Sequence, residues 1–288
     1  MDDSGKFEPN MPQLYGQPMY HYTSESAVIG ILNRDKITLW LKNADYFDDT
    51  TEGKEIYRHL HTACNKLYKA GKITLEQYQQ IISLKDTETY PLEYPTMLFD
   101  SESGGYIQGH NKCTAYVMSF CKEPNNRYMW KGYAKQECCL HFNRDRLNQW
   151  FPRNIECFKE IREVTYCDTD KVNEIKELIL NSIAHDDYLQ EIKDGINASR
   201  YFYKKWFPFH KEKEIRLLFA IPQRAKETTY IEQEFHGSPS IKVEIGPDDE
   251  QFTINGVTIA KNASYERVEQ HFQATDHPLV RIHRKEGS

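Results

Sequence analysis

Segments that favour strands and segments that favour helices follow one another along this chain without a regular rhythm. Runs rich in β-branched and aromatic residues, such as residues 113–121 and 212–221, are separated by amphipathic stretches of unequal length. A doubly wound or barrel fold would need repeated βαβ units, which this order does not provide. The sequence contains no internal repeat and no low-complexity linker. We therefore expect an α+β fold, with a flexible arm at residues 1–17 and a single domain over residues 18–288.

Apolar spacing and turn residues locate the expected elements. Ile56, Leu60, Cys64 and Leu67 recur at helical spacing and indicate a helix that begins near Thr51. Strands are expected at residues 19–24, 36–42, 113–121, 137–143, 158–167, 212–221, 241–245 and 279–284. Further helices are expected at residues 24–35, 74–84, 125–134, 144–151 and 264–272, and in two or more pieces within 170–207.

Two segments carry signals for irregular structure. Residues 85–111 contain Pro91, Pro95 and several glycines, which predict an irregular excursion that could act as a mobile flap. Asn255 and Gly256 stand between β-forming residues, and such a pair is a hairpin signal. The sequence thus predicts irregular structure at residues 85–111 and a hairpin turn at Asn255 and Gly256.

The composition argues against several classes of protein. A formal net charge of -6 does not favour bulk electrostatic binding of nucleic acid, although a local basic patch could still bind it. The chain has no apolar run of about 18 residues, and its acidic, polar start does not resemble a signal peptide. Seven cysteines without a CxxC pair are typical neither of a disulfide framework nor of a zinc site. We expect a cytoplasmic protein with no membrane contact and no metal.

Two carboxylates on the late strand are the first candidates for chemistry. Glu212 and Glu214 lie two positions apart, and a strand projects such residues onto one face. Lys213 and Arg216 lie close by in the sequence. The pair could form a catalytic site, or Glu214 and Arg216 could form an exposed ion pair worth about 0–1 kcal/mol.

Aromatic and polar side chains elsewhere also suggest a binding site, although each has a purely structural alternative. His21 lies in "YHYTS", where it could bind a ligand or simply make a structural hydrogen bond. Trp40 would by default lie in the core, and Trp130 and Tyr133 have the spacing of helical packing residues. The carboxylates of the "YFDDTTE" loop lack the spacing of a calcium loop. The composition alone leaves these alternatives open.

The order of the motifs "YHYT", "LWLK…YFDD…E", "SFC…MWKGYA" and "EKEIR" resembles that of a bacterial family of unknown function, DUF2971, over residues 20–220. The N-terminal part is also similar to the ADP-ribosyltransferase fold with its His–Tyr–Glu pattern. That resemblance implies a split antiparallel β-sheet core with helical insertions, and NAD as the substrate. Lys42 and Asp48 depart from the nearer family, where Ser and Asn are usual.

The resemblance also implies roles for individual residues. Glu214 takes the position of the catalytic glutamate, and Glu212 would orient the acceptor nucleophile or take its proton. His21 takes the position of the histidine that contacts a ribose. Tyr46, Phe47 and Trp40 compete for the position of the middle aromatic residue. The full set of implied cofactor contacts is His21, Tyr22, Thr23, Trp40, Tyr46, Phe47, Trp130 and Arg216.

The chemistry of NAD cleavage calls for these residue types. Breaking the bond between nicotinamide and ribose builds positive charge on the sugar, which a fixed carboxylate stabilises. An aromatic face can stack on the cationic nicotinamide ring. The helix start at Thr23 and Ser24 could offer free amides to the pyrophosphate.

We therefore expect an ADP-ribosyltransferase-like enzyme that uses NAD and modifies a protein or nucleic-acid acceptor. An NAD glycohydrolase, with water as the acceptor, is a close variant. A catalytically idle module of the same fold that binds a nucleotide is an alternative of another class. The basic and aromatic residues at 199–213 would favour nucleic acid as the acceptor, although a solvated helix end has the same composition.

Overall fold

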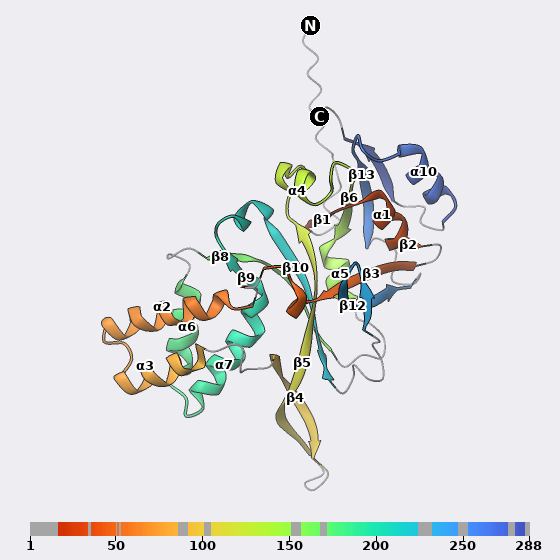
Figure 1. Ribbon diagram of the computed structural model, residues 1–288. Helices are drawn as coiled ribbons and strands as arrows, with labels where there is room; N and C mark the ends of the chain where they lie inside the picture. Colours follow the sequence, from red (N-terminus) through yellow and green to blue (C-terminus); the bar gives the residue numbers. More distant parts are fainter. Residues whose placement is uncertain are drawn as a thin grey trace.

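The structure, a computed structural model, describes residues 17–33, 36–49, 51, 53–85, 92–100, 105–150, 157–167, 172–223, 232–246, 253–275 and 280–285. The arm predicted for residues 1–17 lies outside these residues except for Gln17. Helices and strands are mixed along the chain, and most strands pair antiparallel (Figure 1). The predicted α+β class is confirmed.

Twelve strands of the described part of the chain form one sheet, and two short strands form a separate parallel pair. The sheet contains β1 (Pro18–Thr23), β2 (Leu32–Asn33), β3 (Lys36–Asn43), β4 (Leu92–Asp100), β5 (Gly105–Cys121), β6 (Cys138–Asn143), β7 (Phe158–Glu163), β10 (Glu214–Pro222), β11 (Gln233–Phe235), β12 (Ser238–Ile245), β13 (Ile254–Ile259) and β14 (Arg281–Arg284). The separate pair is β8 (Thr165–Cys167) and β9 (Tyr203–Lys205).

Strand β5 connects most parts of the sheet. Along one edge it pairs with β10 from Cys113 to Cys121. Along its other edge it pairs with β4, then with β3 at Tyr116 and Val117, and finally with β1 at Cys121. Residues 118–120 lie between the registers of β3 and β1. Among the described strand pairs, neither β3 nor β1 pairs with residues 118–120 of β5, so the sheet is open here, beside the first residues of β10.

The two faces of β10 meet different neighbours. Ile215, Leu217 and Phe219 belong to the main apolar core, together with residues of β1, β3, β6, β12 and β13. Leu218 and Ala220 face the opposite side, in a smaller cluster with Tyr201 and Phe202. Because side chains alternate along a strand, Glu214 and Arg216 share this second face. All nine residues of β10 are buried, so both charges lie inside the protein.

Four helices pack on one another beside the sheet (Figure 1). These are α2 (Glu55–Lys69), α3 (Leu75–Ile82), α6 (Asn173–Ser182) and α7 (Tyr188–Ser199). The predicted spacing of Ile56, Leu60, Cys64 and Leu67 is confirmed, since all four side chains are buried in the apolar cluster between the helices. Thr74 and Gln77 form a reciprocal capping box at the start of α3.

Short helices complete the described part of the chain. They are α1 (Glu25–Ile31), α4 (Arg127–Gly132), α5 (Arg144–Gln149) and α10 (Tyr265–Gln273), with 3-10 turns η1 (Ala44–Tyr46), η2 (Ser83–Lys85), η4 (Arg200–Phe202) and η5 (Phe209–Glu212). Helix α1 is shorter than the predicted helix at residues 24–35, because Leu32 leaves it to pair with Ile37 of β3. None of the described helices is both long and apolar enough to cross a membrane.

Three sequence predictions are wrong. Much of the excursion expected at residues 85–111 is a hairpin, because β4 pairs with β5 from Leu92 to Asp100; residues 86–91 and 101–104 lie outside the described part. The Asn255–Gly256 pair makes no turn but lies within β13, where the register against β6 shifts at Gly256. A Cβ at Gly256 would lie 3.0 Å from Nδ1 of His141, so glycine permits this close approach. The end of the segment expected to be helical, residues 170–207, includes strand β9.

Candidate functional site

The carboxylate of Glu214 lies buried at the start of β10 and accepts four hydrogen bonds. Oε1 accepts from Oγ of Ser119 at 2.5 Å and from Nε of Arg216 at 2.8 Å. Oε2 accepts from Nζ of Lys204 at 3.0 Å and from Nη2 of Arg216 at 3.2 Å. Burial by itself would raise the pKa of Glu214, but the charges of Arg216 and Lys204 and these hydrogen bonds outweigh it and lower the pKa to about 2. Glu214 is therefore ionised and is a poor proton acceptor.

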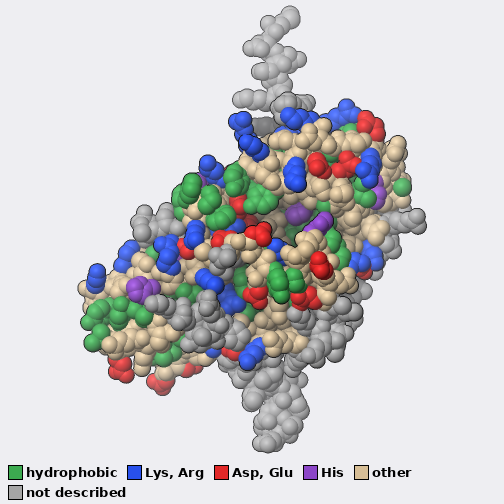
Figure 2. Space-filling view, in the orientation of Figure 1, with side chains coloured by type: hydrophobic (Ala, Val, Ile, Leu, Met, Phe, Trp, Pro, Cys, Tyr) green, Lys and Arg blue, Asp and Glu red, His purple; other side chains and the backbone are tan. Residues whose placement is uncertain are grey.

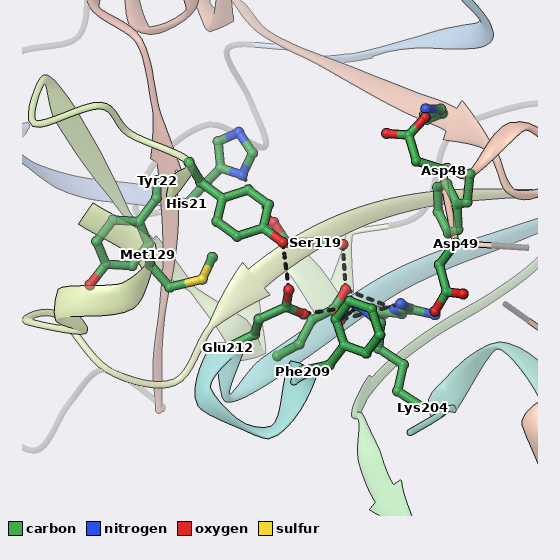
Figure 3. Close-up of a pocket in the computed structure, with 14 residues that line it drawn as sticks. His21, Tyr22, Asp48, Asp49, Ser119, Met129, Lys204, Phe209 and Glu212 are labelled. Carbon is green, nitrogen blue, oxygen red and sulfur yellow. Dashed lines mark hydrogen bonds and ion pairs between the residues drawn. The ribbon is translucent and has the colours of Figure 1, made fainter. Parts of the chain in front are cut away.

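Glu212 reaches the same place from a different element. The two glutamates were expected on one face of a strand, but Glu212 ends η5 and Lys213 turns the backbone at φ 50° before β10 begins. Lys204 of β9 nevertheless joins them, since its Nζ lies 2.9 Å from Oε2 of Glu212. The hydroxyl of Tyr133 donates to Oε1 of Glu212 at 2.5 Å (Figure 3). The alternative of an exposed ion pair between Glu214 and Arg216 is wrong, because both residues are buried.

A pocket of about 290 Å³ opens onto these carboxylates. Its walls combine aromatic, acidic and basic side chains, and four carboxylates stand against three cations. The lining residues are His21, Tyr22, Lys42, Phe47, Asp48, Asp49, Ser119, Met129, Tyr133, Lys204, Phe209, Glu212, Glu214 and Arg216 (Figure 3).

Two phenylalanine rings of this pocket lie beside cations. The guanidinium carbon of Arg216 lies 5.7 Å from the ring centroid of Phe47, and Nζ of Lys42 lies 5.8 Å from the same centroid. Nζ of Lys204 lies 4.7 Å from the ring centroid of Phe209. The pocket therefore offers both flat apolar surfaces and fixed charges, which suits a ligand with both a flat ring and polar groups.

His21 of β1 lies beside residues 118–120 of β5, where the sheet is open between β3 and β1. Its Nδ1 lies 3.0 Å from the carbonyl oxygen of Ser119. A carbonyl can only accept, so Nδ1 carries the proton and donates. Burial lowers the pKa of His21, which keeps the ring neutral and leaves Nε2 as an acceptor. The ring also meets Phe120 edge-on, with centroids 5.8 Å apart.

Tyr22 and Trp130 have mainly structural partners. The hydroxyl of Tyr22 donates to the carbonyl oxygen of Glu123 and accepts from the amide of Asn126. Its ring meets Trp130 edge-on at 5.1 Å, and Nε1 of Trp130 donates to the carbonyl oxygen of Pro124. Tyr22 lines the pocket, whereas Trp130 is fully buried outside its lining.

Three other predicted contacts also lie outside the lining residues. Trp40 stacks on Phe235 with centroids 4.3 Å apart. Tyr46 is exposed, beside Phe47. Thr23 is the last residue of β1, and a backbone amide of the helix that follows it already has a partner within the protein. The amide of Glu25 donates to Oε2 of Glu137, so a pyrophosphate would have to displace a carboxylate there.

Sequence reasoning missed several residues that complete the site. Ser119 and Lys204 bind Glu214, and Met129 and Phe209 form part of the wall. Ser119 is 95 positions from Glu214 in the chain, and only the register of β5 against β10 brings them together. Lys204 lies in the basic aromatic run that had been considered for nucleic acid. Among the residues with described positions, no group of three or more His, Cys, Asp or Glu side chains could hold a metal ion.

Comparison with known proteins gives one family match. A model of the family described as "Protein of unknown function (DUF2971)" matches residues 129–217, from α4 into β10. The matched stretch includes Tyr133, Lys204, Glu212, Glu214 and Arg216, and it supports the predicted resemblance to this family. No curated protein and no solved structure matches the chain.

Proposed function

We propose that the protein is an ADP-ribosyltransferase-like enzyme that binds NAD in this pocket and cleaves the bond between nicotinamide and ribose. The ADP-ribose would pass to a macromolecular acceptor, either protein or nucleic acid. The observation that carries the proposal is the buried, ionised carboxylate of Glu214, which lies in a pocket with His21 and aromatic side chains.

Glu214 would act through its charge. Its low pKa makes it unsuitable as a general base, but a fixed anion stabilises the positive charge that develops on the ribose as nicotinamide leaves. Ser119 and Arg216 hold the carboxylate in one position, so no reorganisation is needed during the reaction. Glu212 is the second carboxylate in the pocket and would orient the acceptor or take its proton.

The walls of the pocket suit the nicotinamide end of NAD. The rings of Phe47 and Phe209 offer flat surfaces for stacking, and the excess of one carboxylate over the cations favours a positively charged ring. The neutral Nε2 of His21 can accept a hydrogen bond from a ribose hydroxyl. A volume of about 290 Å³ is at the lower end for ligand pockets, so the adenosine half would lie beyond it.

Lys42 is one of the three cations that line the pocket. It replaces the serine usual in the resembled family, and no carboxylate partner for it is found among the described residues. Its Nζ lies over Phe47 at the wall of the pocket. A phosphate group of NAD would find a counter-charge here.

Release of nicotinamide from NAD, measured by chromatography, tests the proposal. Wild type should release nicotinamide and Glu214→Gln should not, while the surface variant Glu244→Gln should match wild type. Circular dichroism would show that each variant is folded. Release that depends on added cell lysate indicates a transferase, and release without it indicates an NAD glycohydrolase. Full turnover by a folded Glu214→Gln variant would refute the mechanism.

One observation favours a catalytically idle module of the same fold. Every acceptor position of the Glu214 carboxylate is already filled by donors of the protein, which leaves none free for a ribose. Such a module would bind NAD, measured by calorimetry, without releasing nicotinamide under any condition.

A further inference from the structure

Two segments beside the pocket form a surface whose charge is opposite to that of the chain. Residues 124–136 and 203–213 together contain seven lysines and arginines but only one acidic residue, Glu212. Glu212 is buried and bonded to Lys204. The two segments therefore have a formal net charge of +6, whereas the whole chain has -6. We call the exposed side chains of these two segments the rim surface.

The structure holds the two segments together. Nδ2 of Asn126, the residue that caps α4, donates to the carbonyl oxygen of Lys211 at 2.7 Å. The hydroxyl of Tyr133 reaches Glu212 across the same boundary. Met129 and Tyr133 from the first segment, and Phe209 from the second, also line the pocket. The rim surface is thus one continuous surface at the mouth of the pocket.

The rim surface also includes exposed aromatic rings. Trp206 is 44% exposed and Phe207 is 74% exposed. Trp206 lies flat against His210, with ring centroids 4.6 Å apart and planes 3° apart. His210 in turn donates from Nδ1 to the carbonyl oxygen of Trp206, which fixes the stacked pair. Tyr128 on α4 adds a ring that is 39% exposed.

The same two segments also carry exposed lysines and an exposed arginine. Arg127, Lys131, Lys135, Lys211 and Lys213 are all exposed. Figure 2 shows a hollow in the middle of this face, with hydrophobic, basic and acidic side chains around it. Exposed aromatic rings cost free energy in water, and five exposed cations lie in the same two segments. Both features are explained by a ligand that has flat rings and a negatively charged backbone.

We propose that the rim surface binds single-stranded nucleic acid. Phosphates would neutralise the lysines and arginines, and unpaired bases would stack on Trp206 and Phe207. A duplex has no free base faces, so the exposed rings favour a single strand. The proposal that this surface binds nucleic acid depends only on these observations. The surface adjoins the pocket, so the bound strand could also be the acceptor of ADP-ribose, and that second role rests on the function proposed above.

The test is the fluorescence anisotropy of labelled oligodeoxythymidylate and oligouridylate of about 12 nucleotides, titrated with the full chain at several salt concentrations. Binding should appear at low salt and weaken steeply as salt is added. Trp206→Ala should weaken it roughly 5- to 150-fold through loss of stacking. Lys131→Gln combined with Lys211→Gln should reduce the slope of log K against log salt by about 1.4.

Controls and opposing outcomes follow from the same assay. Lys69→Gln combined with Lys72→Gln removes two exposed charges around the carboxyl end of α2 and should change nothing. Absence of binding at low salt would overturn the proposal. So would equal binding of a duplex with no effect of Trp206→Ala, or binding of an acidic peptide in place of both oligonucleotides. The anisotropy assay contains no NAD, so its result is independent of the nicotinamide-release assay described above. Oligonucleotide binding by a protein that releases no nicotinamide would refute only the proposed enzyme. Nicotinamide release by a protein that binds no oligonucleotide would refute only the proposed surface.

Discussion

Nε of Arg216 lies 2.8 Å from Oε1 of Glu214, two residues away on the same face of β10. Arg216 is only 1% exposed, and it also donates to the carbonyl oxygen of Tyr201. Removing Arg216 takes two of the four hydrogen bonds from the buried Glu214 carboxylate and leaves Lys204 as the one cation bonded to it among the described residues. Arg216→Met should therefore lower the free energy of unfolding by about 3–5 kcal/mol, measured by urea denaturation.

The ion pair between Lys36 and Glu244 is the matched control for Arg216. Its Nζ to Oε2 distance, 2.9 Å, is similar, but both side chains are about one third exposed. Lys36→Met should therefore cost about 0–1 kcal/mol. Equal losses of unfolding free energy in the two variants would show that burial does not increase the contribution of Arg216 to stability.

Glu214 should make stability depend on pH in acid. Its pKa in the folded protein, about 2, lies below the ordinary value of 4.5, so the unfolded chain binds this proton more readily. The stabilisation is complete above about pH 5 and is lost as the pH falls through 4.5 towards 2. The shift corresponds to about 3 kcal/mol. Urea unfolding at a series of pH values should show this decline.

Glu214→Gln is the reference for that pH series. Other carboxylates with lowered pKa values, Glu55 and Glu244, add to the decline in both proteins. Glu214→Gln should keep the pH dependence due to Glu55 and Glu244 and lose the part due to Glu214. Its free energy of unfolding should therefore fall less steeply as the pH is lowered. Parallel curves for the two proteins would contradict the low pKa of Glu214.

His21 can be tested with two variants that separate its two ring nitrogens. The amide of His21→Asn can still donate to the carbonyl oxygen of Ser119, but it lacks an acceptor at the position of Nε2. Loss of one hydrogen bond to a ribose should raise KM for NAD roughly 3- to 10-fold in both His21→Asn and His21→Ala. Only His21→Ala should also lose stability, because its Ser119 carbonyl has no donor. Unchanged KM in both variants would assign His21 a structural role alone.

The sequence could predict the type of the long elements because their patterns are local. Both the helical spacing from Ile56 to Leu67 and the apolar run of β10 are visible in a short stretch of sequence. The hairpin of β4 and β5 was missed because its prolines and glycines predict irregular structure. Among the described strands β4 pairs with β5 alone, and Pro95 is tolerated there because an edge strand leaves one row of its amides unpaired.

The site was harder to predict because its contacts span the chain. Glu214 and Arg216 lie two residues apart, so their pairing could be read from the sequence. Their partner Ser119 could not, since it depends on which strand lies beside β10. Lys204 looked like one more residue of a basic run, and only the short strand β9 directs it to the two glutamates. Polar residues within otherwise apolar strands, such as Ser119 in "VMSFC", are the one signal that could have suggested it.

Trp130 provides a test of whether an aromatic residue of the resembled family motif acts by packing or by binding. It is fully buried, contacts Tyr22 edge-on and has Nζ of Lys285 4.2 Å from its ring centroid, but it does not line the pocket. Trp130→Ala should lower the free energy of unfolding by about 3–5 kcal/mol through loss of packing. Trp130→Phe keeps most of the ring volume, so it should cost less and leave KM for NAD unchanged. A raised KM in a Trp130→Phe variant of wild-type stability would show instead that the indole contacts the ligand, and the pocket would then have to extend beneath α4.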